Sequence, residues 1–67
     1  MNFAEALQAL YSGKAITRPG INGIVFQKET KAGKIVIKSM HFKSDSGHEK
    51  GWLPKQGDIY TEEWRIV

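Results

Sequence analysis

Arg18 is the residue of this sequence whose surroundings point most directly to a chemical role. It is one of only two arginines, and it precedes Pro19-Gly20-Ile21-Asn22-Gly23, a segment with two turn signals. Such turns can direct several backbone N–H groups at one point, and an arginine beside them suits a phosphate or another anion. A plain hairpin with a surface arginine is the alternative interpretation.

Trp52 is the second candidate for a binding role. It stands between the polar stretch 43–50 and Pro54, directly after Lys50-Gly51. An aromatic ring at the junction of a loop and a strand can form a platform on which a nucleotide base stacks. The alternative is a tryptophan that covers a small core.

Catalytic and metal chemistry find little support in the sequence. His41 falls within a predicted strand and His48 within a polar loop, whereas a metal site needs at least three converging ligands. The serines lack the setting of a nucleophile elbow. Glu62 and Glu63 are adjacent, so on a helix they would point in different directions. We therefore expect a protein that is not an enzyme and that uses no metal or cofactor.

Composition narrows the class of protein further. The chain has 67 residues, a net charge of +3, 40% hydrophobic and 25% charged residues, which are values of a folded domain, and we expect residues 1–67 to form a single one. The absence of cysteine excludes disulfides, thiolate metal sites and a cysteine nucleophile, and it suits a reducing cytoplasm. No apolar run approaches the roughly 20 residues of a membrane span.

The charge and the size of the chain indicate which binding partners to expect. Eight of the ten cations are lysines spread along the chain, which favours a solvated surface and argues against nucleic acid. A domain of this size buries only about 60% of its unfolded surface. We therefore expect a homo-oligomer, a dimer or tetramer, in which the chain shares core with a second copy.

The elements that must position these residues begin with a helix over residues 2–12. Its apolar residues fall on one stripe with the helical period: Phe3, Ala6, Leu7, Leu10 and Tyr11. Asn2 and Glu5 have the spacing of a capping box, and Gly13 stands where a left-handed cap is expected.

The rest of the chain is typical of short strands. We expect strands over 15–18, 23–29 and 34–42, with the last two joined into a hairpin by the turn at 31–33. A mobile loop over 43–50 and a short strand at 52–53 should follow. Asp58 is then expected to cap one helical turn that runs to residue 64, before a terminal strand at 65–67. This order predicts an α+β fold, a small antiparallel sheet with an N-terminal helix and a short C-terminal helical turn.

Two motifs resemble those of a small phage and prophage family long labelled a domain of unknown function. Its members read F-x-EAL-x-x-L-x-x-GK-x-x-R-x-GWNG near the start and W-x-PSQ-x-D-x-x-A-x-DW-x-V near the end. The corresponding segments here are Asn2–Leu7, Gly13-Lys14, Arg18 and Gly20–Gly23, then Trp52–Ile59 and Glu62–Val67. The family includes Thoeris anti-defence proteins, which act as sponges for cyclic ADP-ribose-type immune signals without cleaving them, and an anti-CRISPR inhibitor.

The resemblance implies a site and a ligand. Arg18 would hold phosphate, Asn22 and Gly23 would shape the pocket, Trp52 would stack on or wall a base, and Pro54 belongs to the same motif. Asp58 would cap the short helix or accept a hydrogen bond from a ribose hydroxyl or base amine. The implied partner is a cyclic nucleotide-type signal in the host cytoplasm, bound between subunits. Ile21 stands where the family usually has Trp, Lys55 where it has Ser and Thr61 where it has Ala.

Two alternatives stay open. One is a protein-binding inhibitor of a host defence effector such as a CRISPR nuclease, in which the sheet edge would matter together with Lys28, Lys31, Lys34 and Lys38. The other is a structural or regulatory phage protein with no small ligand.

Overall fold

The computed structural model describes all of residues 1–67 and begins with helix α1, Phe3–Tyr11. The predicted capping box is present, because the Asn2 side chain accepts from the Glu5 backbone N–H and the Glu5 side chain accepts from the Asn2 backbone N–H, each at 2.9 Å. Gly13 has φ +91°, as the predicted left-handed cap requires. The helix predicted over residues 2–12 is therefore confirmed, with its ends shifted by one residue.

A five-stranded antiparallel sheet follows. Its strands are β1 (Ile16–Thr17), β2 (Gly23–Ala32), β3 (Ile35–Ser44), β4 (Glu49–Gly51) and β5 (Arg65–Ile66), in the order β4-β3-β2-β1-β5. Helix α2, Gln56–Tyr60, lies between β4 and β5 in the chain. The predicted α+β class, with an N-terminal helix and a short C-terminal helix, is confirmed.

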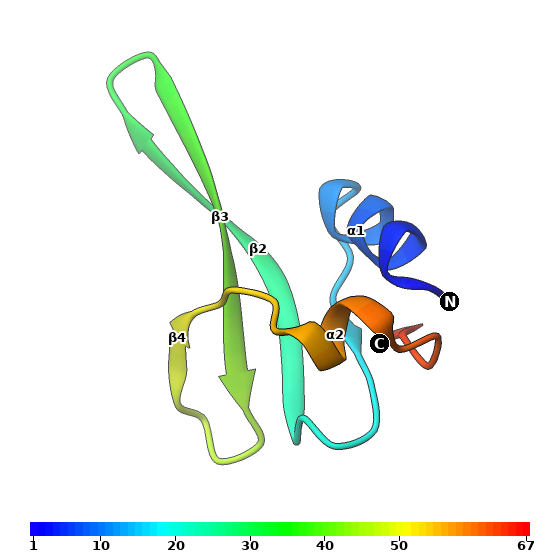
Figure 1. The fold of residues 1–67 in the computed structure, drawn as a ribbon. Helices are drawn as coiled ribbons and strands as arrows, with labels where there is room; N and C mark the ends of the chain where they lie inside the picture. Colours follow the sequence, from blue (N-terminus) through cyan, green and yellow to red (C-terminus); the bar gives the residue numbers. More distant parts are fainter.

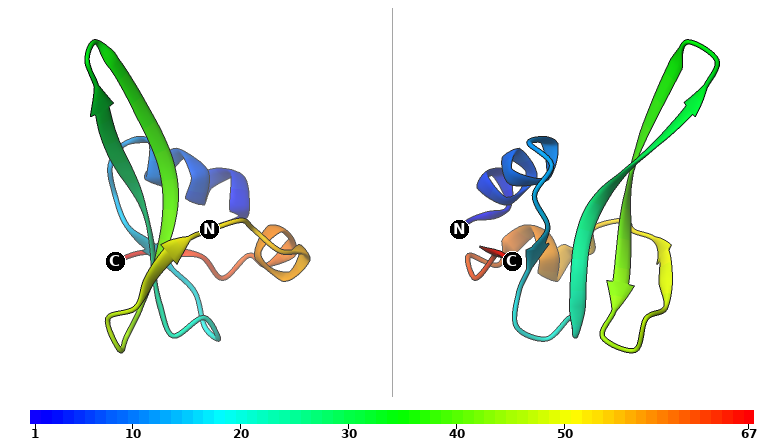
Figure 2. Two further views of the ribbon diagram at one scale, coloured as in Figure 1. Left: turned by 90° about the vertical axis from the view of Figure 1, so that its left-hand side faces the viewer. Right: turned by 180° about the vertical axis from the view of Figure 1, so that it is seen from behind.

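The hairpin of β2 and β3 is the longest feature of the molecule. The two strands pair continuously from Gly23 opposite Ser44 to Ala32 opposite Ile35. Both helices lie beside the lower part of the hairpin, and its tip extends well beyond them (Figures 1 and 2). The radius of gyration is 12.2 Å, against about 11 Å for a compact chain of this length. The outer part of the hairpin is therefore an arm rather than part of the globular body.

The core sits where α1 packs on the short strands. Six apolar residues are buried: Ala6, Ala9, Leu10, Ile16, Val25 and Trp64. The first three come from one face of α1. Ala6 and Leu10 belong to the predicted apolar stripe, whereas Ala9 does not, and Tyr11 of that stripe is 63% exposed. Asp58 is the one charged residue buried with them.

The C-terminal third differs from the sequence prediction in three places. The stretch expected to be a mobile loop is partly strand, because β3 continues to Ser44 and β4 returns over Glu49–Gly51. Trp52 and Leu53 are not a strand, since the chain leaves the sheet there and only the Trp52 N–H still bonds to the Met40 carbonyl, at 3.0 Å. Helix α2 ends at Tyr60 instead of residue 64.

Neither helix is long and apolar enough to span a bilayer.

Candidate functional site

A cavity of about 590 Å³ opens between the sheet, the segment after β4 and α2. This volume is in the range of small-molecule sites. The residues that line it are Arg18, Ile21, Phe42, Lys50, Gly51, Trp52, Leu53, Lys55, Gly57 and Asp58. Three of the six predicted binding residues, Arg18, Trp52 and Asp58, are thus brought together around one hollow.

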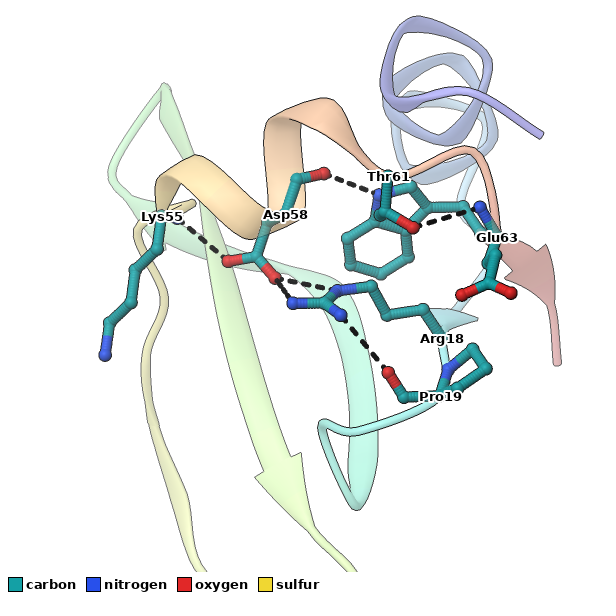
Figure 3. Close-up of polar contacts among 7 residues, drawn as sticks. Arg18, Pro19, Lys55, Asp58, Thr61 and Glu63 are labelled. Atoms are coloured by element: carbon teal, nitrogen blue, oxygen red, sulfur yellow. Dashed lines mark hydrogen bonds and ion pairs between the residues drawn. The ribbon is translucent and has the colours of Figure 1, made fainter.

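Arg18 and Asp58, which both line this cavity, form an ion pair (Figure 3). Arg18 Nε and Nη2 both donate to Asp58 Oδ1, at 3.0 and 2.8 Å, while Nη1 donates to the Pro19 carbonyl at 3.1 Å. Asp58 Oδ2 accepts the Lys55 backbone N–H at 2.8 Å. The Asp58 side chain is 7% exposed. Because its carboxylate lies directly against the guanidinium of Arg18, the positive charge of Arg18 is largely neutralised within the protein.

Asp58 does cap α2, but from inside the helix. It is the third residue of α2, and its side chain reaches back to the N–H of Lys55, the residue that precedes the helix. The prediction that Asp58 caps the short helix is confirmed, but the helix begins at Gln56, two residues before Asp58. Residues 56 and 57 already have helical backbone. The Asp58 carboxylate therefore accepts the Lys55 N–H, which has no partner within the helix, from inside the first turn.

Trp52 covers the aromatic part of the core and also faces the cavity. Its ring centroid lies 6.4 Å from that of Phe3 and 6.2 Å from that of Trp64, edge to face with the latter. Trp52 is half-buried; its role in covering the core is confirmed by these contacts, whereas stacking of a base on it stays a prediction. One part of the indole packs on the core, and the rest is available as a wall of the cavity.

Two lysines give the cavity its charge. Lys50, Lys55 and Arg18 line it together with one carboxylate, that of Asp58. Since Arg18 and Asp58 form an ion pair, Lys50 and Lys55 are the cations left to face a ligand. Lys50 Nζ lies 6.0 Å from the centre of the Phe42 ring, and the Lys55 side chain extends away from the Asp58 carboxylate (Figure 3). The cavity therefore suits an anion next to an aromatic group.

The other three predicted site residues do not line this cavity. Asn22 has φ +51°, and its carbonyl accepts the Asp45 N–H at 2.9 Å, so it joins two turns. Gly23 is buried where β2 starts, and a Cβ there would meet the Lys43 carbonyl and the Phe42 ring. Pro54 is half-buried in the segment before α2. A direct contact of any of these three residues with a ligand stays a prediction.

Sequence reasoning missed several residues of the site. Lys50 and Lys55 were treated as members of a dispersed lysine population, and Phe42 as a strand residue. The available signal was local, because both lysines flank Trp52 within three residues. Ile21 does line the cavity, so an aliphatic side chain stands where the related motif has an indole.

A separate polar cluster lies on the sheet. Lys28 Nζ donates to Glu49 Oε2 at 2.7 Å, and this contact holds the pKa of the Glu49 carboxyl below its ordinary value, with His41 and Lys43 acting in the same direction. Ser39 Oγ lies 3.0 Å from His41 Nε2. His41 Nδ1 is 3.6 Å from Glu49 Oε2, too far for a hydrogen bond.

The fold and the cavity together define a small α+β domain with a cationic, tryptophan-walled hollow beside its short second helix. The profile of the Tad2-like family, described as a Thoeris anti-defense 2-like domain, matches residues 1–67, so the chain belongs to this family. No curated protein matches the chain significantly. Membership confirms the family suggested by the two sequence motifs, and it identifies the chain as a phage anti-defence protein.

Proposed function

We propose that this protein binds and sequesters a cyclic ADP-ribose-type immune signal in the host cytoplasm without cleaving it. The observation that carries the proposal is the placement of Trp52 beside Lys50 and Lys55 around one cavity. A cyclic nucleotide signal offers adenine rings and phosphates, which these side chains are suited to recognise. Family membership supports an anti-defence role for such binding.

The division of roles follows from the geometry. Trp52 walls or stacks on a base, which contributes about 1–3 kcal/mol. Lys50 and Lys55 contact phosphate, since each charge-assisted hydrogen bond contributes roughly 1.5–3 kcal/mol. The guanidinium of Arg18 donates three hydrogen bonds inside the protein, and its two remaining N–H groups can still meet the ligand. Asp58 holds Arg18 and α2 in place.

A second copy of the chain completes the site in this proposal. Nanomolar affinity corresponds to about 12 kcal/mol, and a cavity open to solvent leaves much of a nucleotide-sized ligand uncovered. A homo-oligomer in which a neighbouring copy closes the hollow would supply the missing contacts. It would also enlarge a core that holds only six buried apolar residues in one chain.

Isothermal titration calorimetry with cyclic ADP-ribose as the probe tests the proposal. The wild-type protein should bind it, and heating the complex should release a molecule that chromatography shows to be chemically intact. Lys50→Gln combined with Lys55→Gln should weaken binding at least ten-fold and flatten its dependence on salt, whereas Lys14→Gln, an exposed lysine after α1, should change neither. Absence of binding by the wild type, or a cleaved product, would refute the proposal.

The second candidate function is inhibition of a host defence protein. It is favoured by three exposed aliphatic residues of the hairpin arm, Ile35, Val36 and Ile37. Such side chains suit a protein partner better than a nucleotide. A purified defence nuclease that forms a stoichiometric complex with the wild type but not with arm variants would support this function. Calorimetry with the nucleotide would then show no binding.

A further inference from the structure

Strand β4 carries part of the rim of the candidate cavity, although it is held to the sheet on one side only. It has three residues, lies at the end of the sheet and pairs with β3 alone (Figure 1). Successive side chains of a strand point to opposite faces. Lys50 lines the cavity, so Glu49 points to the other face of the sheet. The position of β4 therefore determines where Lys50, and Trp52 just beyond it, stand at the cavity.

Glu49 connects β4 to the rest of the sheet by a side-chain contact that crosses β3. Lys28 belongs to β2, and β3 lies between β2 and β4. Lys28 Nζ donates to Glu49 Oε2 at 2.7 Å. This hydrogen bond is the main cause of the lowered pKa of the Glu49 carboxyl. Glu49 is therefore ionised between about pH 6 and about pH 8, and the contact is present throughout that range.

His41 lies beside this contact and has one nitrogen without a partner. Its Nε2 lies 3.0 Å from Ser39 Oγ, whereas Nδ1 is buried, makes no hydrogen bond and lies 3.6 Å from Glu49 Oε2. A neutral imidazole has one N–H and one lone pair. A lone pair on Nδ1 is repelled by the carboxylate, whereas a doubly protonated ring can donate from both nitrogens. Hydrogen bonds between charged groups are also shorter and stronger than neutral ones.

The charged groups around this carboxylate come from two strands. They are Lys28 on β2, and His41 and Lys43 on β3. The ring of Phe26 on β2 lies 6.0 Å from the His41 ring, centroid to centroid, and carries no charge. Lysine stays protonated near neutral pH, whereas histidine changes its charge between about pH 5 and about pH 8. His41 is therefore the neighbour of Glu49 that responds to pH in this range.

We infer that Glu49 is a positioning residue of the candidate site, held by Lys28 and bound more firmly when His41 takes up a proton. The proton gives the same carboxylate oxygen a second cationic partner, which draws β4 toward β3 and fixes Lys50 at the rim of the cavity. Mild acid should therefore favour ligand binding. The link to affinity rests on the proposed function, whereas the attachment of β4 can be measured without any ligand.

Amide hydrogen exchange of the full chain, followed by NMR without ligand, tests the attachment of β4. The Trp52 N–H donates to the Met40 carbonyl just beyond β4, so its protection factor reports how firmly this segment is held. The factor should be about two- to five-fold higher at about pH 6 than at about pH 8. His41→Gln should abolish this difference. The matched control, His48→Gln, changes an exposed residue directly before β4 and should keep it.

Substitutions of the ion pair separate positioning from a general loss of stability. Glu49→Gln should lower the protection of the Trp52 N–H about two- to five-fold at about pH 8 and remove its response to pH, while the amides of α1 keep theirs. Lys28→Glu combined with Glu49→Lys should restore protection at that pH. The response to pH should then reverse its sign, because protonated His41 faces a cation at position 49.

Calorimetry with cyclic ADP-ribose completes the test. The affinity of the wild type should be about two- to five-fold higher at about pH 6 than at about pH 8, and His41→Gln should remove this dependence. Wild-type protection that is equal at both pH values, or a Glu49→Gln variant that exchanges like the wild type, would overturn the inference. So would ligand binding that ignores both substitutions. A wild type that binds no nucleotide would refute the proposed function instead, and hydrogen exchange would still decide whether Glu49 positions β4.

Discussion

Arg18 and Asp58, forty residues apart in the chain, are joined by two hydrogen bonds that converge on one carboxylate oxygen. The pair ties the end of β1 to helix α2, and the second carboxylate oxygen anchors the start of that helix at Lys55. The guanidinium also lies 5.7 Å from the centre of the Trp64 ring. One ion pair therefore holds three parts of the chain around the candidate cavity.

Removing Arg18 should be costly to folding. Arg18→Ala leaves a nearly buried carboxylate without its counter-charge, so the free energy of unfolding should fall by about 3 kcal/mol, as measured by urea denaturation. In the double variant with Asp58→Asn the loss should be smaller than the sum of the two single losses. Arg65→Ala, at an exposed position of β5, is the control and should change stability by less than about 0.5 kcal/mol. Additive losses would show that the pair is not coupled.

Trp52 should affect both stability and binding, and two variants separate these effects. Trp52→Ala removes the contacts with Phe3 and Trp64, and it should lower the free energy of unfolding by about 2–3 kcal/mol and abolish detectable nucleotide binding. Phe3→Leu disturbs the same aromatic cluster without lining the cavity. It should reduce stability while calorimetry shows unchanged affinity. Loss of affinity in Phe3→Leu equal to that in Trp52→Ala would mean that Trp52 acts only through the core.

Ile21→Trp should restore a stacking surface at the cavity. Ile21 lines the hollow, and the related motif has Trp at this place. An added aromatic contact contributes about 1–3 kcal/mol per base, so the dissociation constant for cyclic ADP-ribose should fall by about 5- to 100-fold in calorimetry. Ile21→Val keeps an aliphatic wall and should bind as the wild type does. Unchanged or weaker binding by Ile21→Trp would show that no base lies against this wall.

Gly23 should tolerate no side chain. A Cβ at this position would meet the Lys43 carbonyl and lie 2.7 Å from Phe42 ring atoms. Gly23→Ala should therefore lower the free energy of unfolding by about 1–3 kcal/mol, seen as a lower midpoint of denaturation. Gly51→Ala is the matched control, because a Cβ there has no neighbour within 4 Å. Equal effects of the two substitutions would contradict the steric explanation.

Acid should release the contact between Glu49 and Lys28. The pKa of Glu49 is lowered in the folded protein, so its contribution to stability is fully present above the pKa of the unfolded chain. That contribution is lost as pH falls through the lowered pKa. In Lys28→Met the pKa of Glu49 should rise toward its ordinary value, as a carbon NMR titration of the carboxyl group would show. Lys14→Met should leave it unaltered, and an unmoved pKa in Lys28→Met would exclude the contact in solution.

Local signals predicted much of the fold. The capping box of Asn2 and Glu5, the left-handed Gly13 and the turn at Gly33 act over three or four residues, so α1 and the long hairpin could be derived from sequence. β4 is three exposed residues, none of them apolar, that pair with β3. No side-chain pattern marks such a strand, so its position could not be predicted.

The sequence predicted three residues that line the candidate site, Arg18, Trp52 and Asp58, but not the contacts between them. Arg18 and Asp58 were assigned separately, one to phosphate and the other to a helix cap. Their pairing depends on the folding of segments far apart in the chain. Lys50 and Lys55 were missed because charge alone does not say which lysines face a cavity. Those lysines become distinctive only once Trp52 and α2 are placed beside each other.

The contact that anchors α2 does not involve the side chain of residue 55, which lines the cavity. Asp58 bonds to the backbone N–H of residue 55 and not to its side chain, so position 55 can change its chemistry at little cost to the helix. Arg18 and Asp58, by contrast, form an ion pair, so replacing one of them alone leaves the charge of the other unpaired. Single substitutions at the rim of the cavity can therefore change its charge while the scaffold stays constant. The serine-to-lysine difference at position 55 is the kind of step that such an arrangement permits.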